Sequence, residues 1–185
     1  MLIETPRLIL REFTADDLPA MITFFSDPDV GRYIGGQWST EEAQKYLQGI
    51  MAGQTQQTRH TWELSVALRS TGEVIGSAEL VVTNAAHREA EIGYMLARAH
   101  WGFGYATEAA RALVAFGFDS MGLHRIWATC EPANLGSAHV LEKCGMIREG
   151  HLRANRLHKD GAWRDRFLYA VLEDEYRAAC GEPQA

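Results

Sequence analysis

A glycine-rich segment at residues 101–109, Trp-Gly-Phe-Gly-Tyr-Ala-Thr-Glu-Ala, is the part of the sequence best suited to binding an anion. It lies between a predicted strand at 90–96 and a predicted helix at 106–118. Glycines let a ligand approach the backbone closely, and a helix start presents free N–H groups at the positive end of its dipole. The segment fits a dinucleotide site, another phosphate or pyrophosphate site, or a structural turn.

The dinucleotide interpretation is the weakest of these three. A G-x-G-x-x-G fingerprint needs a small third residue, where this chain has Thr107, and a sheet that is parallel from its first strand. The strand at 90–96 instead follows two strands that read as an antiparallel hairpin. The G-x-x-x-x-G-K-[ST] loop of nucleoside triphosphatases is also missing from the sequence.

Hydrophobic periodicity and cap residues predict about seven strands and about four helices around this segment. The predicted strands are 7–11, 62–68, 74–82, 90–96, 125–130, 146–158 and 163–171, and the helices begin near 14, 39, 106 and 134. A helical crossover usually returns the chain parallel. We therefore expect 90–96 and 125–130 to be parallel neighbours in an otherwise antiparallel sheet.

The composition is typical of one globular domain. The 185 residues have a net charge of −6 and are 46% hydrophobic, so we expect a single domain over 1–185 with its core at about 7–175. There is no apolar run long enough for a bilayer and no basic cluster, which predicts a cytoplasmic protein without membrane or nucleic-acid partners. Cysteine and histidine spacing predicts neither a disulfide framework nor a metal site.

Three further blocks accompany the glycine-rich segment in a fixed order. They are residues 4–11 (ETPRLILR), 90–94 (AEIGY) and 134–146 (NLGSAHVLEKCGM). With 101–109 they resemble the GNAT superfamily of N-acetyltransferases, most closely the branch of the ribosomal-protein alanine N-acetyltransferases. The likeness covers nearly the whole chain.

The resemblance implies an α/β (α+β) fold with a mixed, mostly antiparallel twisted sheet of about seven strands and about four flanking helices. In this fold the two central parallel strands, here 90–96 and 125–130, splay apart. Acetyl-CoA, used as a cosubstrate, occupies the gap between them.

The resemblance also implies which residues bind acetyl-CoA. The pantetheine arm pairs with the backbone of Tyr94, Met95 and Leu96, and Asn134 matches a cofactor-contacting asparagine. Trp101 replaces the glutamine or arginine usual in the phosphate loop, so the pyrophosphate is held by backbone amides. These amides belong to Gly102, Phe103, Gly104, Tyr105, Ala106 and Thr107.

A base for the amine is sought among the acids of the central strands, Glu79 and Glu91. Glu91 matches a position where some family members place their base, and strand alternation puts it on the face of Gly93 and Met95. We favour Glu91. The structural alternative is an ion pair between Glu91 and a basic residue such as Arg88 or Arg125.

Two departures from the family pattern concern the thiolate and the acceptor. Many members protonate the CoA thiolate with a tyrosine where this chain has Leu141. Ser137 is the expected substitute, the alternative being a structural serine in the first helical turn. The branch also has a glutamate in its late hairpin where this chain has Arg156, which is no base at neutral pH and is suited to a substrate carboxylate.

The sequence thus predicts an acetyl-CoA-dependent N-acetyltransferase that acts by direct transfer on a primary amine, either a small molecule or a protein N-terminus. The alternative is a non-catalytic acyl-CoA-binding regulatory protein. We expect the segment 31–39 to be a loop that selects the substrate. The C-terminal hairpin offers a surface for a homodimer, although no sequence feature requires one.

Overall fold

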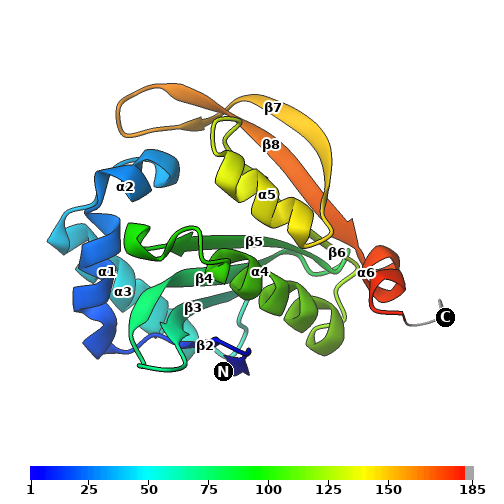
Figure 1. Ribbon diagram of the computed structural model, residues 1–185, viewed down its shortest axis with the longest axis horizontal. Coiled ribbons are helices and arrows are strands. Elements are labelled where there is room, and N and C mark those ends of the chain that lie inside the picture. The colour runs from blue at the N-terminus through cyan, green and yellow to red at the C-terminus, as the bar shows by residue number, and fades with distance from the viewer. Residues whose placement is uncertain (182–185) are drawn as a thin grey trace.

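The computed structural model describes residues 1–181. Its strands form one mixed sheet in the order β1-β2-β3-β4-β5-β6-β8-β7 (Figure 1). They are β1 Leu2–Glu4, β2 Leu8–Glu12, β3 Thr61–Leu68, β4 Val74–Asn84, β5 Glu89–Leu96, β6 Arg125–Cys130, β7 Ile147–Leu157 and β8 Trp163–Leu172. Among these described strands only β5 and β6 pair in parallel, so the predicted mixed architecture is confirmed.

The sheet has one more strand than predicted, the short edge strand β1, and the described residues contain six α-helices instead of about four. The helices are α1 Leu18–Phe25, α2 Pro28–Ile34, α3 Thr40–Gln54, α4 Tyr105–Ala115, α5 Leu135–Lys143 and α6 Glu173–Ala179. The predicted α1, α3, α4 and α5 are present within a few residues of their expected starts. None of the helices in the described part has the length and hydropathy needed to cross a membrane.

The prediction of a loop at 31–39 was wrong for its first half, because α2 continues to Ile34. The Asp27 carboxylate caps this helix by accepting hydrogen bonds from the N–H groups of Asp29 and Val30, at 2.8 and 3.3 Å. Pro28 occupies the first helical position, where its missing N–H costs nothing. These start signals lie upstream of the segment that was expected to be a loop.

The parallel strands β5 and β6 separate soon after they meet. Pairing is confined to residues 89–91 of β5 and 125–127 of β6, although the strands continue to Leu96 and Cys130. The other edge of β6 pairs with β8, so β8 and β7 diverge from β5 together with β6. The expected splay of the central strands is confirmed.

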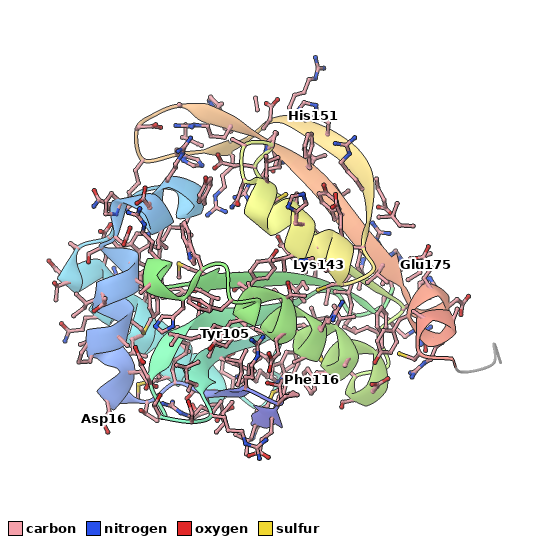
Figure 2. All side chains as sticks on the ribbon, viewed as in Figure 1. Asp16, Tyr105, Phe116, Lys143, His151 and Glu175 are labelled. Carbon is pink, nitrogen blue, oxygen red and sulfur yellow. The ribbon has the colours of Figure 1, made fainter. Side chains whose placement is uncertain are left out.

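Helices cover both faces of the sheet. Strand residues such as Leu64, Leu80 and Ile92 form one buried core with the apolar side of α4, which includes Leu113. Helix α4 packs against β5 and contacts α5 (Figure 1). Figure 2 shows Tyr105 at the N-terminal end of α4. A second core, centred on Phe24, lies between the opposite face and helices α1 and α3.

The β7–β8 hairpin arches towards α2 and closes one side of the molecule (Figure 1). The Lys159 N–H donates to the Gly35 carbonyl at 2.9 Å, and Lys159 Nζ lies 2.6 Å from a Glu42 carboxylate oxygen. Near the base of this contact the buried His158 Nε2 lies 2.8 Å from Glu131 Oε1. The hairpin tip is thereby held against the segment between α2 and α3.

Candidate active site

A cavity of about 770 Å³ runs along the separation of β5 and β6. It is lined by β5, the glycine-rich loop, β6 and α5, and by two arginines of the hairpin, Arg156 and Arg166. All the site residues predicted from the sequence line it except Phe103, whose exposed side chain points elsewhere and is stacked near Tyr105. The fold therefore brings distant sequence blocks to one cavity.

The glycine-rich loop ends at the start of α4. Gly102 and Gly104 have φ angles of +82° and +81°, in the left-handed region that favours glycine. Gly104 is the N-cap residue of α4, and no side chain of the described residues caps this helix start. The N–H groups at residues 105–107 have no partner within the helix and adjoin the cavity. This arrangement suits a pyrophosphate.

A clamp that the sequence analysis missed holds the loop in place. The Glu108 carboxylate accepts hydrogen bonds from the Thr5 hydroxyl (2.7 Å), the Arg7 N–H (2.9 Å) and Arg7 Nε (2.6 Å). Burial alone would raise the pKa of Glu108, but these hydrogen bonds outweigh it and lower the pKa. Arg7 also donates to the Phe103 carbonyl at 2.9 Å. The N-terminal segment therefore positions the loop.

A second feature missed in the sequence is a hydroxyl pair between β5 and α5. The Tyr94 hydroxyl lies 2.9 Å from Ser137 Oγ and donates to the Ser137 carbonyl at 3.1 Å. Asn134 caps α5 by accepting from the Ser137 N–H at 3.0 Å. Burial raises the pKa of Tyr94 well above its usual value, so the phenol stays protonated. Leu141 is fully buried nearby in the core.

Three glutamates share the face of the sheet opposite α4. Glu63 and Glu79 are directly paired across β3 and β4, while Glu91 lies on β5 beside Gly93. A Cβ at Gly93 would lie only 2.7 Å from a Glu79 carboxylate oxygen, so glycine leaves room for that side chain. Burial, then the charge of Glu79, raises the pKa of Glu91, although Arg166 and Arg156 oppose the shift.

The ion pairs considered for Glu91 are not formed. Arg88 instead lies 3.7 Å from Glu173, and Arg125 pairs with Glu89 and Glu149. Among residues 1–181, Glu91 has no basic nitrogen at ion-pair distance, which leaves its carboxylate available to the cavity.

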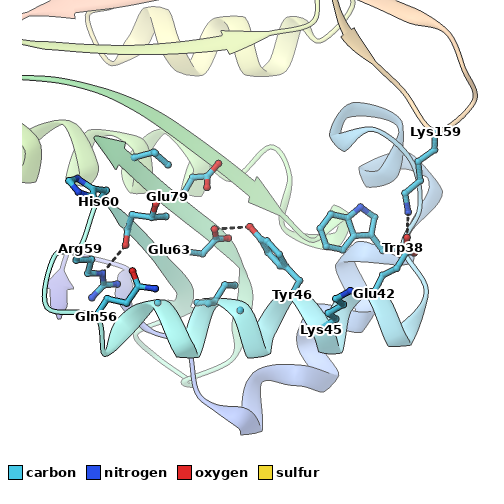
Figure 3. Close-up of a pocket in the computed structure, with 15 residues that line it drawn as sticks. Trp38, Glu42, Lys45, Tyr46, Gln56, Arg59, His60, Glu63, Glu79 and Lys159 are labelled. Carbon is cyan, nitrogen blue, oxygen red and sulfur yellow. Dashed lines mark hydrogen bonds and ion pairs between the residues drawn. The ribbon is translucent and has the colours of Figure 1, made fainter. Parts of the chain in front are cut away.

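A second cavity of about 810 Å³ reaches two of these carboxylates, Glu63 and Glu79, from the α3 side (Figure 3). Trp38, Tyr46, Glu63 and Glu79 line both cavities. Figure 3 shows the Tyr46 hydroxyl directed at Glu63, to which it donates at 2.7 Å. Burial, with the charge of Glu79, raises the pKa of Glu63 to about 8.

This raised pKa predicts a pH-dependent loss of stability. Between the ordinary value of 4.5 and about 8 the folded protein keeps a proton on Glu63 that the unfolded chain releases, so stability falls as pH rises through this window. Glu63→Gln removes this titration and preserves an acceptor for Tyr46. We expect its Tm, measured by calorimetry, to exceed that of the wild type by roughly 10 °C at pH 8.5 and to lie close to it at pH 5.

The control is Gln44→Ala, a change of an exposed, uncharged side chain on α3, for which the Tm difference should not vary with pH. If the stabilities of the wild type and Glu63→Gln depend on pH in the same way, the raised pKa does not belong to Glu63.

A parallel strand pair that separates beside an uncapped, glycine-flanked helix start is the arrangement that the sequence resemblance implies for an acetyl-CoA-dependent transferase. The family described as "Acetyltransferase (GNAT) domain" matches residues 7–147. The uncharacterized N-acetyltransferase YnaD of Bacillus subtilis (strain 168) is 36% identical over 176 residues, which cover 95% of this chain and 99% of YnaD.

Solved structures agree with this assignment. A GNAT-family acetyltransferase from Bacillus anthracis has 34% identity and a TM-score of 0.84, covering 94% of this chain and 99% of that one. The spermidine N-acetyltransferase of Vibrio cholerae in complex with CoA and spermine shares the fold at 23% identity, with a TM-score of 0.78 and coverage of 93% and 99%.

The chain belongs to the GNAT acetyltransferase family. It is an N-acetyltransferase, and GNAT acetyltransferases take their acetyl group from acetyl-CoA. The resemblance found in the sequence is thereby confirmed.

Proposed function

We propose that the protein transfers an acetyl group directly from acetyl-CoA to a primary amine bound on the glutamate side of the β5–β6 cavity. The observation that carries this proposal is the continuity of one cavity from the free amides at the start of α4, past the Tyr94–Ser137 pair, to Glu91. Acetyl-CoA supplies a thioester as the acyl donor. The residues below bind it or manage protons.

The phosphate end of acetyl-CoA fits the glycine-rich loop. The amides of residues 102–107 are proposed to hold the pyrophosphate, because the helix start leaves those of residues 105–107 without acceptors and the loop at 102–104 leads directly into it. Phe103 belongs to this set through its backbone only. Asn134, which lines the cavity, caps α5 with its side-chain oxygen and keeps its amide NH₂ for the cosubstrate.

The strand edge of β5 offers backbone groups at alternate residues. The Ala97 N–H donates to the Ile75 carbonyl of β4 at 2.8 Å, and bonded pairs alternate along an antiparallel ladder. Met95, paired with Ser77, therefore directs its backbone groups to β4. The backbone groups of Tyr94 and the N–H of Leu96 point to the open side of β5. We assign the contacts with the pantetheine arm to these backbone groups, and we assign to Met95 a contact through its side chain.

The reaction needs a proton acceptor for the substrate amine and a proton donor for the departing thiolate. Glu91 is proposed to accept the proton of the substrate ammonium, since a carboxylate with a raised pKa is a better base. The Ser137 hydroxyl, on the α5 side, is proposed to donate a hydrogen bond or proton to the departing sulfur, and the Tyr94 hydroxyl, 2.9 Å from Ser137 Oγ, is proposed to donate to Ser137 in turn. We propose that Tyr94 supplies the phenol that Leu141 cannot, and this supports turnover over a non-catalytic regulator.

The hydroxyl pair is testable by deletion. We expect Tyr94→Phe and Ser137→Ala each to lower kcat about tenfold while the Kd for acetyl-CoA changes less than about twofold, because the pair acts on the leaving group. The double variant should lose less kcat than the product of the two single losses predicts, since the hydroxyls act together. Steady-state kinetics and calorimetry measure these values.

A matched control is Tyr176→Phe, which deletes a hydroxyl bonded to Asp119 outside the cavity and should leave kcat unchanged. An unaltered kcat in both site variants would contradict the proton-donor role.

The proposed activity is tested by calorimetric titration with acetyl-CoA, followed by a free-thiol assay over small-molecule amines and peptides with free N-termini. Binding with amine-dependent thiol release supports the proposal. Binding without release on any amine supports the regulatory alternative, and absence of binding contradicts both.

A homodimer remains part of the proposal through the edge strand β7, where Ile147 and Leu157 are exposed. Analytical ultracentrifugation distinguishes a dimer from a monomer.

A further inference from the structure

Arg166 is a buried cation in the cavity without an ion-pair partner among the described residues. Its side chain is only 6% exposed and lines the β5–β6 cavity. Its hydrogen bond runs to the Thr129 carbonyl at a long 3.4 Å. No carboxylate of residues 1–181 lies at ion-pair distance from it, whereas Arg11, for comparison, is 2.7 Å from Asp17. A buried guanidinium with unused donors is costly unless a ligand pairs with it.

Strand register places Arg166 on the acceptor side. Glu91 pairs with Trp127 of β6, and Trp127 pairs with Ala170 of β8. Arg166 lies four residues along β8 from Ala170 and therefore shares its face and that of Glu91. The same cavity thus holds an available carboxylate and, among residues 1–181, a guanidinium without a carboxylate partner.

Arg156, on β7, adds a second cation to this part of the cavity. Its guanidinium contacts the Ile34 carbonyl at 3.4 Å and, among the described residues, has no carboxylate partner. Burial and the charge of Arg156 lower the pKa of Arg166, although the charges of Glu131 and Glu91 oppose this shift, so two cations lie near each other with no carboxylate at ion-pair distance from Arg166 among residues 1–181. The contacts of Lys159, near the hairpin tip, with Gln37 and with Glu42 of α3 hold Arg156 over the cavity.

We propose that the acetyl acceptor is a small amino carboxylate, such as a free amino acid, whose carboxylate binds Arg166 and Arg156 while its amine faces Glu91. This inference rests on the proposed transfer to an amine and specifies its substrate class. A planar carboxylate matches the fork of a guanidinium. A polyamine would bring further positive charge against both arginines, and a phosphate dianion would meet the charges of Glu79, Glu91 and Glu131.

The test compares acceptors that differ only in the carboxylate. A panel of amino acids, β-alanine and γ-aminobutyrate is assayed beside the matching carboxamides and spermidine. We expect the preferred amino carboxylate to exceed its carboxamide in kcat/KM by about tenfold or more. Calorimetry with CoA present should also show N-acetyl amino acid binding more tightly than its carboxamide, without any turnover.

The variants are Arg166→Gln, Arg166→Lys and Arg156→Gln, with Arg153→Gln on β7 as an exposed control outside the cavity. Arg166→Gln should raise the KM for the carboxylate by about tenfold to a hundredfold, with little change for the carboxamide or in acetyl-CoA affinity. Arg166→Lys should recover part of the loss. If Arg166→Gln does not fold, Arg156→Gln, at an exposed residue, and Arg166→Lys decide.

Equal or better use of carboxamides or spermidine would overturn the carboxylate assignment while leaving acetyl transfer established. If Arg166→Gln lowers kcat/KM equally for the carboxylate and the carboxamide, Arg166 has a structural role. That result would also overturn the carboxylate assignment. Absence of transfer to every amine would contradict the proposed function, and this inference with it.

Discussion

Glu91→Gln is expected to lower kcat by about a hundredfold or more while leaving the Kd for acetyl-CoA within about twofold. Glutamine preserves the size of the side chain but cannot accept the proton of the substrate ammonium, and a positioned general base contributes a factor of this order. Glu91 lines the cavity and has no basic ion-pair partner among residues 1–181, so the loss should be chemical rather than structural.

The pH profile distinguishes a base from a structural acid. Burial and the charge of Glu79 raise the pKa of Glu91, and only its ionised form accepts a proton. The kcat of the wild type should therefore rise as pH increases through that raised pKa and then level off. In Glu91→Gln this acidic limb should disappear, leaving a low rate.

Glu79→Gln is the informative comparison, because Glu79 is the other candidate on the same face of the sheet. We expect it to lower kcat much less and to retain the acidic limb. A larger loss in Glu79→Gln than in Glu91→Gln would transfer the base role to Glu79.

Gly104→Val is expected to raise the Kd for acetyl-CoA by about tenfold to a hundredfold. Gly104 has a φ of +81°, where a β-branched residue is strained, and it forms the N-cap of α4. The chain must shift to relieve this strain, which displaces the amides of residues 105–107 from a common anion. The added side chain also crowds the backbone that the phosphates approach.

Gly72→Val provides a matched control. Gly72 has a φ of +75° in the turn between β3 and β4, and a Cβ added there would meet no described atom within 4 Å. The strain is comparable, but the site lies outside the acetyl-CoA cavity. Both variants should lower Tm, and only Gly104→Val should weaken binding in calorimetry. Unchanged affinity in Gly104→Val would remove the loop from the site.

Signals that act over a few residues predicted most of the fold. Ser39 and Glu42 form a capping box at the start of α3, as the sequence pattern indicates. Alternation, β-branched and aromatic content and turn residues located β3 to β8 within a few residues, and the crossover rule predicted the parallel pairing of β5 with β6. Short elements escaped, because the three residues of β1 and the seven of α2 give little periodicity to detect.

The residues of the candidate site also divide into those that the sequence predicted and those that it did not. The glycine-rich loop, Glu91, Ser137 and Asn134 were found in the sequence because a local motif or family block carries each of them. Their roles remain predictions, although the structure places them around one cavity. Phe103, which belongs to the same motif, does not line it, because a motif does not specify where each side chain points.

Partners that are far apart in the chain became visible in the folded molecule alone. Ser137 lies 43 residues from Tyr94, and Glu108 lies 101 residues from Arg7, so no local pattern connects them. Arg166 faces Glu91 because the register of β5, β6 and β8 puts both on one side of the sheet. Local patterns in the chain were enough to specify most helices and strands and the loop for the anion. Strand register and helix packing settled which side chains meet across the cavity, because those contacts depend on the position of whole elements.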